Sequence, residues 1–279
     1  KQQEGVPADI SWLLAQKKHT LFGNTYWGEL NNNFWDNSIQ NTLLAYQILK
    51  QSGGHADELD RIVRYFLEQR GSGQWRNTYE SSLILETILP ELMTNGSKPE
   101  APSLTLNNTE IIRSFPFDKI MDAGKLFVVK KGKSPVYFTA YQQFKNPSPQ
   151  KVSKDFIVKT WFEQKGTIVK SLQAGTSATL KAEVEVSGDA DYVMIEIPVP
   201  AGCSYENKVQ LFRGVETHRE YFKHKTSIFC SKLKQGKYTF EIQLTPRYSG
   251  NYNLNPAKAE MMYFPVFYGR EGMKKININ

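Results

Sequence analysis

Residues 1–97 place hydrophobic and polar side chains at the spacing of amphipathic helices. Three stretches carry apolar residues three or four positions apart, which puts those residues on one helix face. The apolar positions are Ile39, Leu43, Tyr46 and Leu49 between residues 38 and 49, Leu59, Ile62, Val63, Phe66 and Leu67 from residue 57 onward, and Tyr79, Leu83, Ile84 and Ile88 in the third stretch.

Helix-stopping and helix-capping residues bound these three stretches. Gly53 and Gly54 follow the first, and Gly71 supplies a C-terminal cap for the second. Asn77 caps the start of the third, and Glu80 three residues later completes a capping box. The sequence therefore predicts three helices in this part of the chain.

Two of the predicted helices are preceded by similar segments. Trp35 lies two residues before Asn37, and Trp75 lies two residues before Asn77, so the pattern recurs after 40 residues. A period of this length that contains two helices is typical of stacked helical hairpins, in which each hairpin buries a face against the next.

Beyond Pro99 the hydrophobic period changes from helical to alternating. Residues 103–106, 125–129 and 135–141 are rich in strand-forming residues, and residues 146–149 (Asn-Pro-Ser-Pro) predict a linker. We therefore place domain boundaries after residues 97 and 150.

Residues 151–279 alternate apolar and polar positions, as expected for strands with one buried and one solvated face. Glycines between the strands provide turn signals and predict an antiparallel β-sandwich. The alternating apolar residues are Leu180, Ala182, Val184 and Val186, then Val193, Ile195 and Ile197, then Tyr238, Phe240, Ile242 and Leu244. The expected fold class is multidomain α and β, with helical hairpins of an α/α-toroid type in residues 1–97, a β segment in 98–150 and the sandwich in 151–279.

Composition and charge narrow the possible functions. The chain has 279 residues, of which 40% are hydrophobic, and no apolar run is long enough to span a membrane. Residues 1–97 carry 8 basic and 11 acidic side chains, so the remaining 27 basic and 17 acidic ones give the rest a formal charge of +10. Because these are mainly lysines scattered along predicted strands, they predict solvated sheet faces and no nucleic-acid partner.

Few residues form patterns that carry chemistry, and we expect no catalytic site, no cofactor and no metal. Phosphate-binding loops, nucleophile elbows and zinc-binding helices are missing from the sequence. Glu216, His218, Glu220 and His224 would share one side of a strand and could ligate zinc, but an exposed polar strand face explains the pattern without metal. His19 and His55 are expected to be solvated.

Cysteine usage leaves open one disulfide bond or two free thiols. Cys203 and Cys230 have no metal-binding or redox spacing, and Cys230 lies in an apolar run that favours a small buried side chain. Glu68-Gln69 and Glu163-Gln164 resemble the end of a Cys-x-Glu-Gln thioester, but neither is preceded by the cysteine that such a bond needs.

Residues 65–69 with Gly73-Gln74-Trp75 resemble the Gln and Gly-x-Trp repeats of terpenoid cyclases, which tie helical hairpins into a toroid. This resemblance supports the toroid. An α/α-toroid enzyme is one alternative, and it would need clustered acids, of which the run Asp57, Glu58 and Asp60 is the best example. These acids occupy the first turn of a predicted helix, where the helix dipole already favours negative charge.

The chain is most similar in its signatures to the C-terminal part of bacterial alpha-2-macroglobulin-like proteins. The matching stretches are 35–37 with 42–46 and 70–78 in the helical part, 192–202 in the sandwich, and the closing signature 233–236, 248–250, 256–257 and 259–263. The resemblance implies a portion of a thioester-type helical domain, the second half of a CUB-like domain in residues 98–150, and a receptor-binding-like β-sandwich.

The same resemblance implies a function. Family members inhibit endopeptidases by entrapment after a bait segment is cut, and a thioester, where present, captures the protease. This sequence contains neither a bait segment nor a thioester cysteine. As only a portion of a helical toroid, the chain would also lack ring-closing helices. We therefore expect apolar helix faces, such as those of Leu43, Tyr46, Phe66 and Ile84, to be partly uncovered or covered by another chain.

The leading hypothesis is a non-catalytic C-terminal part of a protease trap, periplasmic or in the cell envelope and lipid-anchored, with proteases as partners of the whole protein. In such a protein the helical domain rests against the sandwich until bait cleavage. The alternative hypothesis is an envelope protein-interaction or adhesion module without inhibitor activity.

Overall fold

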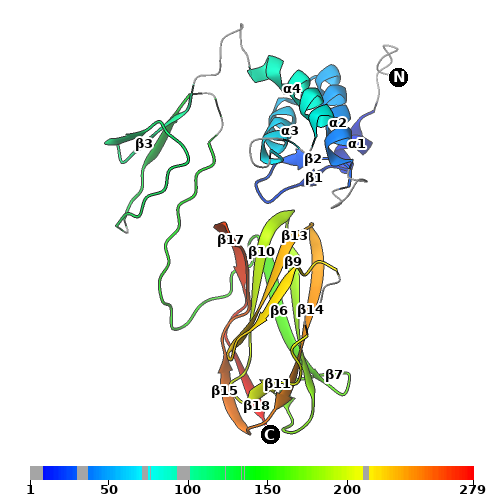
Figure 1. Ribbon diagram of the computed structural model, residues 1–279, viewed down its shortest axis with the longest axis vertical. Coiled ribbons are helices and arrows are strands. Elements are labelled where there is room, and N and C mark those ends of the chain that lie inside the picture. The colour runs from blue at the N-terminus through cyan, green and yellow to red at the C-terminus, as the bar shows by residue number, and fades with distance from the viewer. Residues whose placement is uncertain are drawn as a thin grey trace. The chain divides into compact units, whose positions relative to one another are not determined.

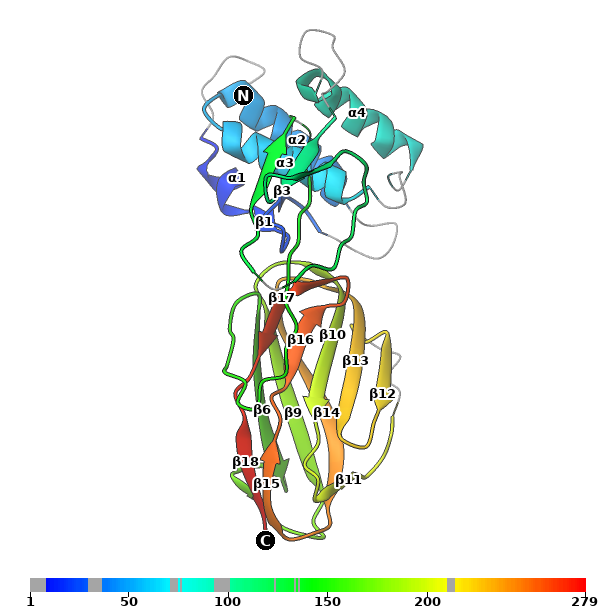
Figure 2. The same cartoon turned by 90° about the vertical axis from the view of Figure 1, so that its left-hand side faces the viewer.

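A computed structural model describes residues 9–29, 37–70, 75, 77–92, 101–122, 124–132, 134, 136–209 and 214–279. The chain divides into two compact units, Lys1–Phe138 and Thr139–Asn279. Figures 1 and 2 show the helices and a small sheet in the first unit and two large sheets in the second. The mixture of α and β parts agrees with the predicted fold class, whereas the toroid and CUB-like assignments stay predictions.

The first unit begins with four helices and a short ribbon. Its helical core consists of residues from the four helices and from β2, including Tyr26 stacked on Tyr65 with ring centroids 5.0 Å apart. The elements are α1 (Ser11–Ala15), β1 (Lys18–His19), β2 (Thr25–Tyr26), α2 (Ser38–Ser52), α3 (Ala56–Glu68) and α4 (Thr78–Leu92).

Local sequence signals fix the ends of these helices. Gly53, with φ of 71°, ends α2 in a backbone conformation that only glycine adopts easily. The Asn77 Oδ1 accepts a hydrogen bond of 2.8 Å from the Glu80 backbone nitrogen and caps α4 as predicted. Pro90 lies inside α4, and Trp35 and Gly71 fall outside the described residues.

A three-stranded antiparallel sheet follows, in the order β4-β3-β5. Its strands are β3 (Ser103–Leu106), β4 (Glu110–Ile112) and β5 (Val128–Lys131). Asn107 and Asn108 both have positive φ and form the tight turn between β3 and β4. The predicted strand at 135–141 is wrong, because residues 136–141 form no strand. Most of their side chains are exposed.

The second unit consists mainly of two five-stranded antiparallel sheets, ordered β12-β13-β10-β16-β17 and β11-β14-β9-β6-β7, and a three-stranded sheet β15-β18-β8 in which β18 and β8 are parallel. The strands are β6 (Phe156–Gln164), β7 (Thr167–Val169), β8 (Ser171–Leu172), β9 (Ala178–Val186), β10 (Ala190–Pro198), β11 (Cys203–Tyr205), β12 (His218–Tyr221), β13 (Lys225–Leu233), β14 (Gly236–Pro246), β15 (Gly250–Leu254), β16 (Lys258–Met261), β17 (Phe264–Arg270) and β18 (Lys274–Ile278).

The central strands of this sandwich bury every second residue. Along β9 the side chains alternate strictly between buried and partly exposed, and β6, β10 and β14 do so over most of their length. The predicted alternation, with one wet and one dry face, is thereby confirmed. Because each sheet has one apolar face, the two faces can leave water only by packing on one another.

Strand β17 approaches β6 closely at Gly269. A Cβ atom added to Gly269 would lie 1.8 Å from the carbonyl oxygen of Phe156. Glycine is therefore the only residue that lets the two backbones come this near. Next to this approach the Glu271 carboxylate accepts hydrogen bonds from the Thr160 hydroxyl (2.6 Å) and backbone nitrogen (3.1 Å), which ties the chain after β17 to β6.

Gly269→Ala is expected to destabilise the second unit by about 3 kcal/mol, because the methyl group must push β17 away from β6. Gly272→Ala is a matched control, since nothing lies within 4 Å of the Cβ that it would add. Urea unfolding of both variants measures the difference in unfolding free energy. Equal effects of the two substitutions would contradict the close approach.

Candidate functional site

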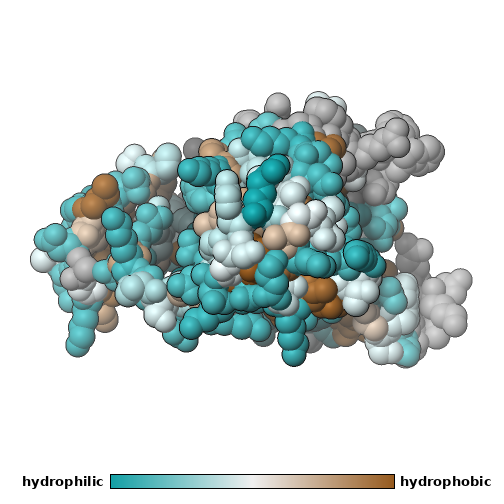
Figure 3. All heavy atoms as spheres, turned by 90° about the horizontal axis from the view of Figure 1, so that it is seen from below, coloured by the Kyte–Doolittle hydropathy of each residue, from teal (hydrophilic) through white to brown (hydrophobic). Residues whose placement is uncertain are grey.

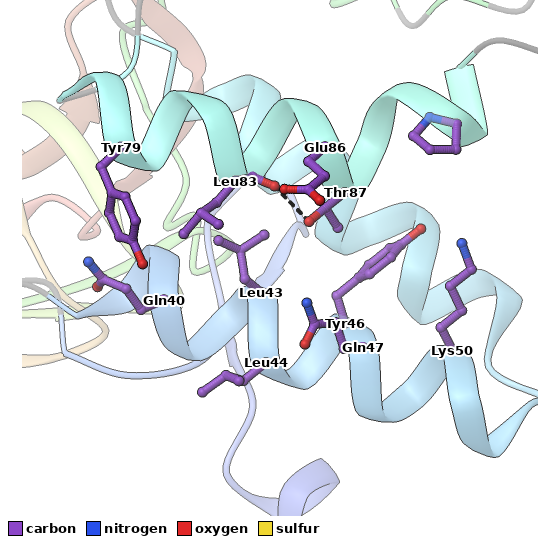
Figure 4. A pocket seen from close by; sticks show the side chains of 11 residues that line it. Gln40, Leu43, Leu44, Tyr46, Gln47, Lys50, Tyr79, Leu83, Glu86 and Thr87 are labelled. Atoms are coloured by element: carbon purple, nitrogen blue, oxygen red, sulfur yellow. Dashed lines mark hydrogen bonds between the residues drawn. The ribbon is translucent and has the colours of Figure 1, made fainter. Parts of the chain in front are cut away.

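The described residues form a surface groove of about 520 Å³ between α2 and α4 (Figure 4). The two helices contribute side chains from equivalent positions of the 40-residue repeat. The groove is lined by Gln40, Leu43, Leu44, Tyr46, Gln47, Lys50, Tyr79, Leu83, Glu86, Thr87 and Pro90.

The floor of the groove is apolar and its rim is mixed. Leu43 and Leu83 point toward one another across the groove (Figure 4), and Leu43 is only 5% exposed. On the rim, Leu44 and Tyr79 expose 57% and 65% of their surface. The Lys50 ammonium group lies 5.8 Å from the centre of the Tyr46 ring. This geometry suits an apolar side chain and offers a cationic group at one end.

A buried polar pair ties the two helices together beside the groove. Glu80 on α4 is fully buried, and its carboxylate accepts a hydrogen bond of 3.1 Å from Gln40 Nε2 on α2. Glu80 was expected in a capping box, and its backbone nitrogen is indeed capped by Asn77. The carboxylate thus serves tertiary packing, which local spacing could not predict.

Reactive groups near the groove are already engaged. The Thr87 hydroxyl donates a hydrogen bond of 2.7 Å to the Leu83 carbonyl oxygen one turn earlier (Figure 4). A nucleophilic hydroxyl must donate its hydrogen bond to a general base. The Thr87 hydroxyl instead donates it to a backbone carbonyl oxygen. The Thr87 hydroxyl is therefore held by its own helix.

The prediction of uncovered helix faces is wrong. Leu43, Tyr46, Phe66 and Ile84 are at most 5% exposed. These side chains pack against α3, β2 and one another within the first unit, so the helical core closes on itself. Among the side chains described on α2 and α4, the exposed large apolar ones are Leu44, Tyr79, Leu85 and Leu89.

The four candidate metal ligands do not share one strand, because only His218 and Glu220 lie on β12, while Glu216 precedes it and His224 follows it. The Glu216 carboxylate accepts hydrogen bonds from Arg219 Nε at 2.9 Å and from Arg219 Nη2 at 2.5 Å. The side chains of Glu216 and Arg219 are 8% and 3% exposed. His218 and Glu220 lie on the exposed face of β12, where His218 Nε2 is 3.5 Å from Glu220 Oε1. Within the described parts of the chain, no three His, Cys, Asp or Glu side chains lie close enough together to hold a metal ion.

Arg219 is the centre of a buried polar cluster that the sequence did not reveal. Its guanidinium group also donates to the Glu241 carbonyl oxygen at 2.8 Å and lies over the Tyr221 ring. The Tyr221 hydroxyl in turn donates to the Val209 carbonyl oxygen at 2.7 Å. Although burial alone would lower the Arg219 pKa, the hydrogen bonds to Glu216 hold it above its usual value. The cluster fastens the loop before β12 to the sheet.

The remaining polar candidates also have structural roles. Glu68 accepts hydrogen bonds from Thr20 and Asn24, and Glu163 accepts one from the Trp161 indole, so both Glu-Gln pairs are structural as predicted. His19, which we expected to be solvated, is partly buried in β1. This burial lowers its pKa.

The acidic run at the start of α3 does not converge on a cavity. Glu58 pairs with Lys17 at 2.9 Å, and Asp60 pairs with Arg64 one turn later on the same helix. Asp57 and Glu58 occupy the first turn, where the helix dipole favours negative charge, as predicted. The run therefore gives no support to the toroid-enzyme alternative.

The sandwich exposes a pair of aromatic rings. Tyr192 and Tyr263 meet edge to face with centroids 5.2 Å apart, and they are 54% and 69% exposed. Tyr192 has φ of 52°, and its carbonyl oxygen accepts a hydrogen bond of 2.8 Å from the Met262 backbone nitrogen. A left-handed tyrosine in a strand is strained, and no sequence signal announces it.

Figure 3 shows one face of the molecule on which hydrophilic residues prevail and hydrophobic residues form small separate groups. Among the residues that the structure describes, no helix is both long and apolar enough to cross a membrane.

Comparison with known proteins assigns the sandwich. Residues 151–265 match the family model of the bacterial alpha-2-macroglobulin MG10 domain. The predicted resemblance to bacterial alpha-2-macroglobulins is confirmed. The match begins at the predicted domain boundary and includes the closing signature that ends at Tyr263. No curated protein sequence matches the chain.

Solved structures of bacterial alpha-2-macroglobulins show distant similarity. Trypsin-activated alpha-2-macroglobulin from Escherichia coli is 13% identical, with 87% of this chain and 18% of that chain covered and a TM-score of 0.47. Salmonella alpha-2-macroglobulin reacted with methylamine is 12% identical, with 89% and 18% covered and a TM-score of 0.42. The chain thus spans less than a fifth of the length of these alpha-2-macroglobulins.

Glu216→Ala is expected to destabilise the MG10-like sandwich by about 3 kcal/mol, because it leaves the Arg219 charge buried without its partner. The double substitution Glu216→Leu with Arg219→Met should recover most of this loss, since no buried charge remains. Glu183→Ala removes a 3.6 Å pair with the exposed Lys159 and should cost less than about 1 kcal/mol. Urea unfolding compares the variants, and equal losses from the two Glu→Ala changes would contradict a buried ion pair.

The cysteines are free thiols, and Cys230 is buried. Burial raises the pKa of Cys203 to about 11 and that of Cys230 to about 12. Because the thiolate is the reactive form, both should resist iodoacetamide at pH 8 in the native chain and react readily in 6 M guanidinium. Mass spectrometry counts the added groups, and rapid labelling of the native chain would contradict this environment.

Proposed function

We propose that the chain is the non-catalytic C-terminal part of a bacterial alpha-2-macroglobulin-like endopeptidase inhibitor. The observation that carries the proposal is the match of residues 151–265 to the MG10 domain of that family. The whole protein would trap proteases after its bait segment is cut, and this part would supply a helical body and the terminal sandwich.

The architecture of the first unit is compatible with this assignment. α2 and α4 are related by the 40-residue repeat and pack together through the buried Gln40–Glu80 contact, as successive hairpins of a toroid would. The three-stranded sheet β4-β3-β5 would be the second half of the CUB-like domain. Proteases would be the partners of the whole protein. That protein would be located in the periplasm or the cell envelope and held there by a lipid anchor.

Packing would carry the function of this part. The polar side chains that could have formed a reaction centre are engaged in ion pairs, caps and backbone hydrogen bonds within their own units. A trap needs such rigid bodies, because sterically enclosing a protease depends on shape and on the release of one body from another.

Entrapment makes a distinctive kinetic prediction. When the whole protein is mixed with an endopeptidase, cleavage of a protein substrate should fall at least tenfold, whereas hydrolysis of a small peptide substrate should persist, because enclosure blocks only large molecules. Parallel assays with a chromogenic peptide and labelled casein measure both rates. If both hydrolysis rates stay unchanged, or if both fall, the result would contradict a trap.

The alternative is an envelope protein-interaction or adhesion module, which the exposed Tyr192–Tyr263 pair favours, since exposed aromatic residues dominate many protein interfaces. The same kinetic assay separates the two functions, because an adhesion module leaves both protease activities unchanged. A pulldown from envelope extract that fails with Tyr263→Ser would then support the alternative.

A further inference from the structure

The two compact units are joined by an exposed connector, which we define as residues 139–146. The first unit ends at Phe138, and residues 136–149 form no helix and no strand. Every residue from 139 to 148 is exposed. The largest side chains of the connector, Tyr141 and Phe144, expose 62% and 73% of their surface.

Contacts within each unit fix the chain on both sides of the connector. Before it, the Tyr137 ring packs edge to face on Phe22 at 5.6 Å. After it, Val152 and Arg270 exchange two backbone hydrogen bonds of 2.9 Å. Asn146 Oδ1 also accepts a hydrogen bond of 2.9 Å from the Ser148 nitrogen, which begins a turn. The connector lies between these fixed points.

An endopeptidase binds its substrate as an extended strand, so a folded segment must open before it can be cut. Opening a core strand costs up to the full unfolding free energy, whereas an exposed segment without secondary structure opens at almost no cost. The connector already meets this requirement. Pro147 and Pro149 lie outside it.

The connector also carries side chains that two classes of endopeptidase recognise. A hydrophobic specificity pocket, as in chymotrypsin, accepts large aromatic residues such as Tyr141 and Phe144. A pocket with a carboxylate at its base, as in trypsin, accepts Lys145. Because the residue after Lys145 is Asn146, no proline blocks this bond.

We propose that the connector is a cleavage site for endopeptidases of chymotrypsin-like and trypsin-like specificity, and that a cut there divides the chain covalently between the two compact units. A protease hydrolyses the Lys145–Asn146 amide with one water molecule, which leaves a carboxylate on Lys145 and an amine on Asn146. Every described sheet lies within one unit, so no strand pairing rejoins the products. This inference does not depend on the proposed function.

A second exposed stretch provides an internal comparison. Residues 113–122 and 124–127, between β4 and β5, also form no helix or strand, and Phe115 and Phe117 in them are 40% and 44% exposed. Both β4 and β5 pair with β3, so a cut in this loop leaves the pieces joined by the sheet. Product masses distinguish the two places.

Limited proteolysis of the chain at low protease ratio tests the proposal, with products identified by intact mass. Trypsin should first yield residues 1–145 and 146–279, and chymotrypsin should first cut after Tyr141 or Phe144. Lys145→Gln should slow the appearance of the 146–279 fragment at least tenfold, and Lys145→Arg should keep the wild-type rate. Lys151→Gln is the matched control, because Lys151 is exposed but adjoins the Val152–Arg270 bridge.

The variants and the product masses decide the outcome. The proposal is upheld if trypsin first yields residues 1–145 and 146–279 from the wild type and Lys145→Gln alone suppresses these products. It is overturned if the first cuts fall in the β4–β5 loop or elsewhere, or if Lys145→Gln is cut at the wild-type rate. Substitution at exposed Lys145 leaves both cores intact, so misfolding does not obscure the result.

Discussion

One-sided burial of the strands is the constraint on which the second unit depends. Ala178, Leu180, Ala182, Val184 and Val186 of β9 are at most 1% exposed, while the residues between them face outward. A sheet with this pattern cannot stay in water alone, because its apolar face must be covered. The opposing sheet covers it, and Gly269 allows the edge strand β17 of one sheet to approach β6 of the other closely.

The first unit solves the same problem with a different element. Its helices bury apolar stripes against one another and against β2, and the aromatic stack of Tyr26 on Tyr65 fills the centre. Polar groups are used for attachment, as in the Gln40–Glu80 contact between α2 and α4. The rim of the α2–α4 groove is exposed at Leu44 and Tyr79.

The sequence predicted what depends on local periodicity. Spacing of three or four residues located α2, α3 and α4, and alternation located the main strands of the sandwich, because both patterns record which side of an element is dry. The Asn77 cap was predictable for the same reason, since it involves residues three positions apart. The signatures around Tyr263 pointed to the family that the MG10 match then confirmed.

Features that join distant residues were not predictable. The expected row of polar residues from 216 to 224 does not form, because β12 spans only His218–Tyr221 and Glu216, which precedes the strand, pairs with the buried Arg219. The helix faces expected to be uncovered are buried, since the packing of α2, α3 and α4 with β2 closes the core without further helices. The left-handed backbone of Tyr192 is set by the β16–β17 turn against it, far along the chain.

The chain consists of two compact units, each with its own core. Native-state hydrogen exchange across a urea series, read by mass spectrometry, tests this claim most directly. It should show two cooperative openings at different urea concentrations, one that exposes amides of β9, β10 and β14 together and another that exposes those of α2 and α3. A single opening in which all of these amides exchange together would contradict it.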